Sequence, residues 1–204
     1  SRRFDATDYD AIGDTGLRLA RDCGDAIIQG ELLYRIGQSY HALGENGLAV
    51  ALLQKSLEFA SDPRGPNRFE LSIILAVVKR TWLTFTLSEC GEFRTGLDHA
   101  KRALGIAEKS EHPLSQVLGW LAIGHVLQRK GELDGAIGCM ERGLLLCDSY
   151  SLPIWRFRLL SSLGAAYACC GQLSNGIDLA EQALAGAERL KLIVDQPLFL
   201  VNLA

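Results

Sequence analysis

Histidine and carboxylate side chains are the groups in this chain best suited to acid–base chemistry, and their spacing is not that of a catalytic site. Asp98 and His99 are adjacent, but neighbouring residues on a helix point about 100° apart and do not face each other. No H-x-x-x-H motif occurs; the four histidines are His41, His99, His112 and His125. No glycine-rich loop opens a strand-to-helix junction that could hold a phosphate. The sequence therefore predicts no catalytic residue and no enzyme activity.

The cysteines also lack the spacing of a functional site. None forms a C-x-x-C pair or a regular disulfide pattern; they are Cys23, Cys90, Cys139, Cys147, Cys169 and Cys170. On one helix, Cys139 and Cys147 would lie about 12 Å apart, too far to share a metal ion. We interpret all six as free thiols in a reducing compartment that pack as small buried hydrophobic residues. This predicts a cytoplasmic protein without a metal ion or other cofactor.

Composition limits the classes of partner. The chain has 204 residues, of which 48% are hydrophobic and 22% charged, so it can bury a substantial core. No apolar run reaches the roughly 18 residues that a membrane-spanning helix needs, and the first residues lack the apolar core of a signal peptide. The net charge of -3 gives no electrostatic reason to expect nucleic-acid binding. We expect no membrane contact and no direct nucleic-acid contact.

One order of small and large residues recurs at fixed distances from a turn glycine. Around Gly171 it places large apolar residues and a helical glycine before the turn and small residues after it: Leu160, Leu163, Gly164, Tyr167, Gly176, Ala180, Ala183 and Leu184. The same offsets from Gly131 and from Gly44 give nearly the same residue types. The elements of the chain are therefore predicted to be helices joined in repeated hairpins.

The unit around Gly91 departs from this order at two positions. Arg80 replaces a large apolar residue, and Thr84 replaces the helical glycine. The preceding interval between turn glycines is 47 residues, whereas the next two are 40 residues each. The additional residues fall in SDPRGPN, residues 61–67, whose prolines and glycine are typical of a loop. We predict a linker there, a helix N-cap at Asn67, and an unusually long helix after it.

Glycines inside the predicted helices have to be explained by packing. A glycine inside a helix costs roughly 1 kcal/mol relative to alanine, yet the repeated units retain Gly37, Gly124 and Gly164 at one phase. Their fixed position indicates that two helix backbones approach each other closely there, with a large residue beside each glycine.

This order of residues resembles the tetratricopeptide repeat, a helical hairpin whose usual period is about 34 residues. The longer period and the x-L-G-x-x-Y-x-x-x-G phrasing are most similar to repeats of bacterial maltose-activator-type transcription regulators and ATPase-coupled nucleotide cyclases. Similar long repeats occur in eukaryotic cell-polarity scaffolds. The resemblance implies an all-α fold, a right-handed superhelical solenoid of antiparallel helical hairpins.

The predicted units form a single array over residues 1–204. We expect the chain to begin and to end within a repeat. In order, the units are the second helix of a truncated repeat at 5–28, repeats at 29–60, 68–112, 113–150 and 151–192 with the linker 61–67 after the first, and the start of a truncated repeat at 195–204. Pro113 and Pro153 stand at the same phase and are predicted in the first turn of their helices, where proline is tolerated.

The resemblance also implies which side chains could hold a partner, because the first helices of tetratricopeptide arrays line a concave face. The positions that correspond to this face are Tyr34, Arg35, Gln38, His41, Trp82, Phe85, Leu121, His125, Arg129 and Arg158. Trp82, Phe85 and Leu121 would form an exposed anchor for a helix or an extended peptide. The alternative is that Trp82 and Phe85 only pack against the neighbouring helix, since their own helix is apolar on several faces.

Two functions from different classes are consistent with such an array. The first is a non-catalytic scaffold that binds a protein or peptide and is part of a larger bacterial regulatory protein. The second is a ligand-sensing domain that controls an attached ATPase, nucleotide cyclase or DNA-binding domain. Chaperone-type recognition of a peptide carboxylate is not favoured, because it needs Lys and Asn where Tyr34, Arg35 and Gln38 stand. A homodimer could form through uncovered apolar residues of the incomplete terminal units, around Leu17 and around Leu198, Leu200 and Leu203.

One ion pair tests the alignment of the unit around Gly91. Glu89 and Arg129 each stand two residues before their turn glycine. Because consecutive first helices in such an array run side by side, equivalent positions should be neighbours. We therefore predict that these two side chains lie within salt-bridge distance.

Overall fold

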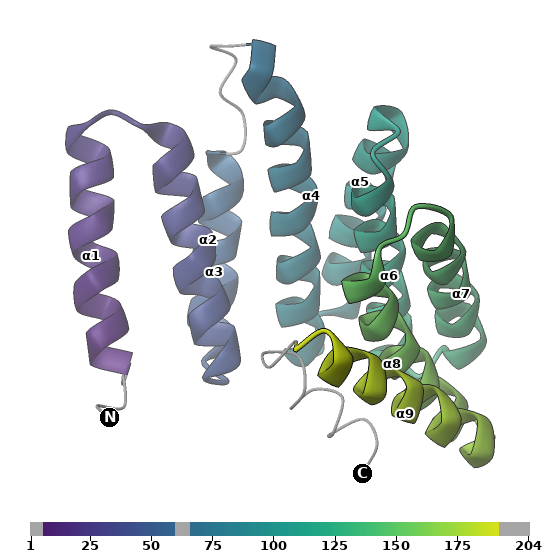
Figure 1. The fold of residues 1–204 in the computed structure, drawn as a ribbon. Coiled ribbons are helices and arrows are strands. Elements are labelled where there is room, and N and C mark those ends of the chain that lie inside the picture. The colour runs from purple at the N-terminus through teal and green to yellow at the C-terminus, as the bar shows by residue number, and fades with distance from the viewer. Residues whose placement is uncertain (1–5, 60–65, 192–204) are drawn as a thin grey trace.

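The computed structural model describes residues 6–59 and 66–191. Within these residues the chain forms helices and no strand, which confirms the predicted all-α solenoid of helical hairpins (Figure 1). The helices are α1 (Ala6–Asp22), α2 (Ala26–Ala42), α3 (Asn46–Glu58), α4 (Pro66–Glu89), α5 (Phe93–Ser110), α6 (Pro113–Lys130), α7 (Leu133–Ser149), α8 (Pro153–Cys169) and α9 (Leu173–Arg189).

The turn between the two helices of each hairpin is made by the predicted glycines. They have φ angles of 80°, 77°, 87° and 81°, at Gly44, Gly91, Gly131 and Gly171 respectively. A residue with a side chain is strained at these positive φ angles, whereas glycine adopts them without strain. Each glycine therefore ends a first helix and lets the chain reverse direction.

Helix starts agree with the sequence at two prolines and differ at two other places. Pro113 and Pro153 begin α6 and α8 as predicted. Helix α2 begins at Ala26, ahead of the predicted residue 29, because the Asp25 side chain accepts hydrogen bonds from two backbone N–H groups of the first turn. Helix α4 begins at Pro66, so the predicted cap Asn67 lies inside the helix, as a proline at the first helical position permits.

Each first helix packs against its own second helix and against the preceding hairpin. The pairs α2–α3, α4–α5, α6–α7 and α8–α9 form the hairpins, and α4 also packs extensively along α6. The largest core cluster lies between the third and fourth hairpins and is centred on Val117, Leu121, Met140, Leu159 and Leu163. Leu198, Leu200 and Leu203, which were predicted as uncovered apolar residues of the incomplete last unit, lie outside the described part of the chain.

The helical glycines mark close contacts within the hairpins. A Cβ on Gly164 would lie 2.7 Å from the carbonyl oxygen of Gly176, and a Cβ on Gly124 would lie 3.1 Å from the Met140 side chain. In the second hairpin Thr84 stands at the same phase, and its hydroxyl donates a hydrogen bond of 3.2 Å to the carbonyl of Gly96. The alignment of the second hairpin is therefore confirmed, with a hydrogen bond in place of the close approach.

A buried lysine that the sequence analysis did not single out connects the first two hairpins. The side chain of Lys79 is 1% exposed, its Nζ lies 3.4 Å from Oε1 of Glu31, and it donates to the carbonyl of Ser56 at 3.4 Å. A Cβ on Gly30 would lie 2.9 Å from this Nζ, so the glycine provides the space for the ammonium group. Burial lowers the pKa of Lys79, and Glu31 opposes that shift. The contact links α4 to both α2 and α3.

We predict that Gly164→Ala lowers the free energy of unfolding by about 3 kcal/mol, because the added methyl group meets a backbone oxygen that cannot move aside cheaply. Gly138→Ala is the matched control: no atom lies within 4 Å of a Cβ there, so it should stabilise by about 1 kcal/mol through helix propensity alone. Urea unfolding followed by circular dichroism measures both. Equal effects of the two substitutions would show that the close contact is unimportant.

We predict that the two members of the Lys79–Glu31 pair differ in how much their substitution costs. Glu31→Gln should lower the free energy of unfolding by about 2 kcal/mol, because it leaves the ammonium group without a counter-charge. The loss is smaller than for a fully buried pair, since the Glu31 side chain is 28% exposed. Lys79→Met should change stability by less than about 1 kcal/mol, because an apolar side chain of similar length removes the desolvation cost as well as the pair. Chemical denaturation of the two variants distinguishes this from a simple packing role, which requires that Lys79→Met be the more damaging change.

Candidate functional site

Four ring side chains form a continuous row across the first helices of three hairpins. His41 lies in the last turn of α2, Trp82 and Phe85 lie one turn apart on α4, and His125 lies on α6. Successive ring centroids are separated by 5.7, 5.8 and 4.6 Å in that order. The first two contacts are edge-to-face, a favoured geometry for aromatic rings. We call these four residues the aromatic row.

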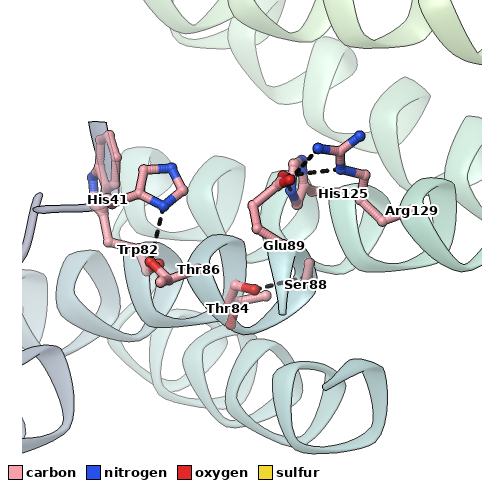
Figure 2. Close-up of polar contacts among 8 residues, drawn as sticks. All are labelled: His41, Trp82, Thr84, Thr86, Ser88, Glu89, His125 and Arg129. Carbon is pink, nitrogen blue, oxygen red and sulfur yellow. Dashed lines mark hydrogen bonds and ion pairs between the residues drawn. The ribbon is translucent and has the colours of Figure 1, made fainter. Parts of the chain in front are cut away.

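The histidine at the α2 end of the aromatic row is held in one orientation by α4. Nδ1 of His41 lies 3.2 Å from the hydroxyl oxygen of Thr86 (Figure 2), and that hydroxyl donates its proton to the carbonyl of Trp82 at 3.0 Å. A hydroxyl has one proton, so the imidazole is the donor in the first contact and carries hydrogen on Nδ1. Burial lowers the pKa of His41, while Glu89 opposes the shift.

The α6 end of the row meets an ion pair, and Figure 2 shows the three side chains together. Nε of Arg129 donates to Oε1 of Glu89 at 2.9 Å, and a second contact joins the guanidinium to Oε2. Nε2 of His125 lies 3.7 Å from the same carboxylate. This confirms the predicted Glu89–Arg129 pair. The imidazole of His125 and the guanidinium of Arg129 lower the pKa of Glu89 to about 2, against the effect of burial.

A cation from the fourth hairpin reaches the same surface. The guanidinium carbon of Arg158 on α8 lies 6.0 Å from the ring centroid of Trp82 and 5.6 Å from that of Trp155. These distances are typical of cation–π contacts. The Arg158 side chain therefore reaches from α8 to α4, although α6 separates the two helices in the array. Trp155 was missed by the sequence analysis because it lies in the first turn of α8, outside the phases assigned to the concave face.

The remaining predicted positions on α2 are occupied by a local pair. The guanidinium of Arg35 lies 5.0 Å from the ring centroid of Tyr34, and its Nη1 donates to Oε1 of Gln38 at 3.2 Å. Arg35 is exposed and Gln38 is partly buried. The structure does not bring these residues into the ring contacts of the aromatic row.

Two predicted surface residues are in the core, which corrects the sequence analysis. Tyr34 is 3% exposed and Leu121 is 4% exposed, so neither can contact a partner, and the patch of Trp82, Phe85 and Leu121 does not exist as predicted. All four residues at this phase, ten before the turn glycine, are buried: Tyr34, Thr81, Leu121 and Ser161. This phase faces the adjoining hairpin, since Tyr34 shares a core cluster with Leu83 of the next hairpin and Leu121 shares one with Leu159. Trp82 and Phe85 are half-buried and pack on core clusters as well, as the alternative interpretation proposed.

The groups that this surface presents are aromatic rings and guanidinium groups. In that part of the chain no three His, Cys, Asp or Glu side chains are grouped so that they could hold a metal ion. Among the described helices none is long and apolar enough to cross a membrane. The surface offers aromatic ring area with the guanidinium of Arg129 at the α6 end of the row and that of Arg158 beside Trp82, a combination enriched at protein interfaces.

The ion pair at the end of the aromatic row makes stability depend on pH. Because the folded-state pKa of Glu89, about 2, lies below the ordinary value of 4.5, the contribution is complete above pH 4.5 and is lost as the pH falls toward 2. We predict that Glu89→Gln removes about 1 kcal/mol at neutral pH, since the pair is partly exposed. Urea unfolding at several pH values measures this. The difference between variant and wild type should shrink below pH 4.5, and a difference independent of pH contradicts the assignment.

Residues 30–63, which span the hairpin of α2 and α3, match the family model described as tetratricopeptide repeat. No curated protein matches the sequence. Among solved structures, the apo form of RapI is similar with a TM-score of 0.71 and 13% identity, covering 93% of this chain and 67% of that chain. BtubC from P. vanneervenii is similar with a TM-score of 0.73 and 14% identity, covering 98% and 82% respectively.

A third similar structure is the Signal Transduction ATPase with Numerous Domains protein with a tetratricopeptide repeat sensor from Pyrococcus horikoshii. Its TM-score is 0.64 at 16% identity, and the match covers 92% of this chain but 28% of that protein. At these identities the likeness shows the fold. The chain therefore carries a tetratricopeptide repeat at residues 30–63 and has the helical-repeat fold of tetratricopeptide proteins.

Proposed function

We propose that this chain is a non-catalytic scaffold that binds a protein or peptide across the aromatic row. The observation that carries the proposal is the row itself: partly exposed rings from three successive hairpins in mutual contact, with Arg129 and Arg158 beside them. Aromatic and arginine side chains supply most of the binding energy at protein interfaces.

The rigidity of the surface supports the same function. Trp82 and Phe85 pack on core clusters on one side and contact other rings on the other. Arg129 remains 49% exposed while Glu89 fixes its guanidinium by two contacts. Side chains that are already ordered lose little entropy when a partner binds. The matching partner is a segment with apolar side chains that cover the rings and an acidic group near Arg129.

A second candidate function is regulation by ligand sensing, within a larger bacterial regulatory protein. It is favoured by the similarity to the signal-transduction ATPase whose tetratricopeptide repeats are named a sensor. In this proposal a ligand on the aromatic row alters the curvature of the array and so controls an attached ATPase, cyclase or DNA-binding domain. A nucleotide-binding or DNA-binding domain encoded beside this chain in its gene would support sensing, and its absence would leave the scaffold.

Either function fits a cytoplasmic protein. All six cysteines are free thiols, but the prediction that they are buried is wrong for Cys23, Cys90, Cys169 and Cys170, which are exposed. Exposed thiols of this kind persist in a reducing compartment.

The scaffold function predicts that peptide affinity depends on the aromatic row and its ion pair. Peptides selected from a random library on the wild-type chain should bind His125→Ala and Arg129→Ala about tenfold more weakly, the effect of a loss of about 1.4 kcal/mol. Lys109→Ala, which removes an exposed cation in the last turn of α5, is the matched control and should bind as wild type. Fluorescence anisotropy measures the affinities. If the selected peptides bind His125→Ala and Arg129→Ala with wild-type affinity, the binding surface lies elsewhere.

A further inference from the structure

Two arginines and a histidine lie at the contact between α4 and α5 and form no ion pair with a carboxylate of the described residues. Nη1 of Arg80 on α4 lies 3.2 Å from Nδ1 of His99 on α5. Arg102 stands three residues after His99, so the two share one face of α5. No ion pair joins Arg80, His99 or Arg102 to a carboxylate in the part of the chain that the structure describes.

The electrostatics of this group are unfavourable as it stands. Burial lowers the pKa of Arg80, and the neighbouring charge of Arg102 lowers it further. Burial also lowers the pKa of His99, with Arg80 and Arg102 acting in the same direction and Asp98 opposing them. Nε of Arg80 is enclosed and has no hydrogen-bond partner in the described residues. Two guanidinium groups and an imidazole therefore share one site, and a negative charge would stabilise all three.

The equivalent places in the other hairpins show what is unusual here. In the third hairpin the ring of Trp120 occupies the phase of Arg80, and the guanidinium of Arg142, in the phase of Arg102, lies 4.8 Å from the ring centroid. The first and fourth hairpins bury Leu33 and Leu160 at that phase. A leucine or tryptophan side chain can be buried at this position without desolvating a charge, whereas burying an arginine there removes its guanidinium group from water. Positions that break a local rule without compensation are candidates for binding.

We propose that Arg80, His99 and Arg102 form a binding site for an oxyanion, the phosphate or carboxylate group of a ligand. Arginine has only hydrogen-bond donors, so Nδ1 of His99 accepts from Arg80 and the imidazole proton is on Nε2. The imidazole N–H, the terminal Nη groups of Arg80 and the exposed guanidinium of Arg102 are then donors for one anion, whereas the enclosed Nε of Arg80 is not.

This site is separate from the aromatic row and does not depend on it. Arg80 precedes Trp82 by two residues, which places their side chains about 200° apart around α4. His99 and Arg102 are on a second helix of a hairpin, whereas every residue of the aromatic row is on a first helix. A peptide could occupy the row while an anion occupies the oxyanion site, and failure of either proposal leaves the other intact.

The test is nuclear magnetic resonance of the His99 imidazole during titration with inorganic phosphate or with acetate, each balanced by chloride at constant ionic strength and pH. We expect a saturable shift of His99 and no such shift of His41 or His112. Saturation by phosphate alone assigns the site to phosphate groups, and saturation by acetate assigns it to carboxylates.

Two variants make the result specific. Arg80→Leu restores the residue type of the first and fourth hairpins and should abolish the saturable shift while leaving the His99 reporter in place. Arg102→Gln changes an exposed side chain and should weaken binding about tenfold, the loss expected for a charge-assisted hydrogen bond. If Arg80→Leu does not fold, as judged by circular dichroism, Arg102→Gln decides. A His99 response to neither anion, or an unchanged response in the folded variants, overturns the proposal.

Discussion

The fold depends on how closely the two helices of each hairpin approach. In the fourth hairpin Gly164 and Gly176 face each other, and a Cβ on either would lie 2.7 Å from the carbonyl oxygen of the other. Such contact fixes the rotation of each helix about its axis, because any other rotation would place a side chain between the backbones. Once the rotation is fixed, the side chains of successive first helices fall at repeated positions. In the second hairpin the hydrogen bond from Thr84 to the carbonyl of Gly96 takes the place of the glycine contact. The Glu89–Arg129 pair and the aromatic row both follow from this alignment.

The candidate site combines stability with availability, and the two requirements oppose each other. A ring that is fully exposed is free to bind but is poorly ordered, and a ring that is fully buried cannot be reached. Trp82 and Phe85 lie between these limits, since the core holds one side of each and neighbouring rings hold an edge. Truncating them would therefore affect folding as well as binding. The charged groups at the end of the row report on binding more cleanly, because Arg129 is largely outside the core.

What the sequence could predict was local or periodic. The turn glycines, the prolines at the starts of α6 and α8, and the alignment of the second hairpin through Glu89 and Arg129 all depend on spacing, and the structure confirms them. Spacing does not determine how successive hairpins pack on one another. That packing buries Tyr34 and Leu121. The predicted surface was therefore wrong at these two residues, and it was incomplete without Trp155, which Arg158 contacts together with Trp82. The sequence could not predict the buried contacts of Lys79 either, because its partners come from two other helices.

Departures from the repeated order carry more functional information than agreements with it. The polar side chains of α4 that pack against other helices include Lys79, Arg80 and Thr84, and the first and last of these are compensated. Thr84 donates to the carbonyl of Gly96, and Lys79 has the Glu31 carboxylate and the Ser56 carbonyl. Arg80 has only a neutral imidazole acceptor, and burial and the charge of Arg102 lower its pKa. The departures at Thr84 and Lys79 are therefore explained by the stability of the hairpin. The departure at Arg80 leaves a half-buried guanidinium without an ion pair among the described residues, and for this reason it is the one that points to a ligand.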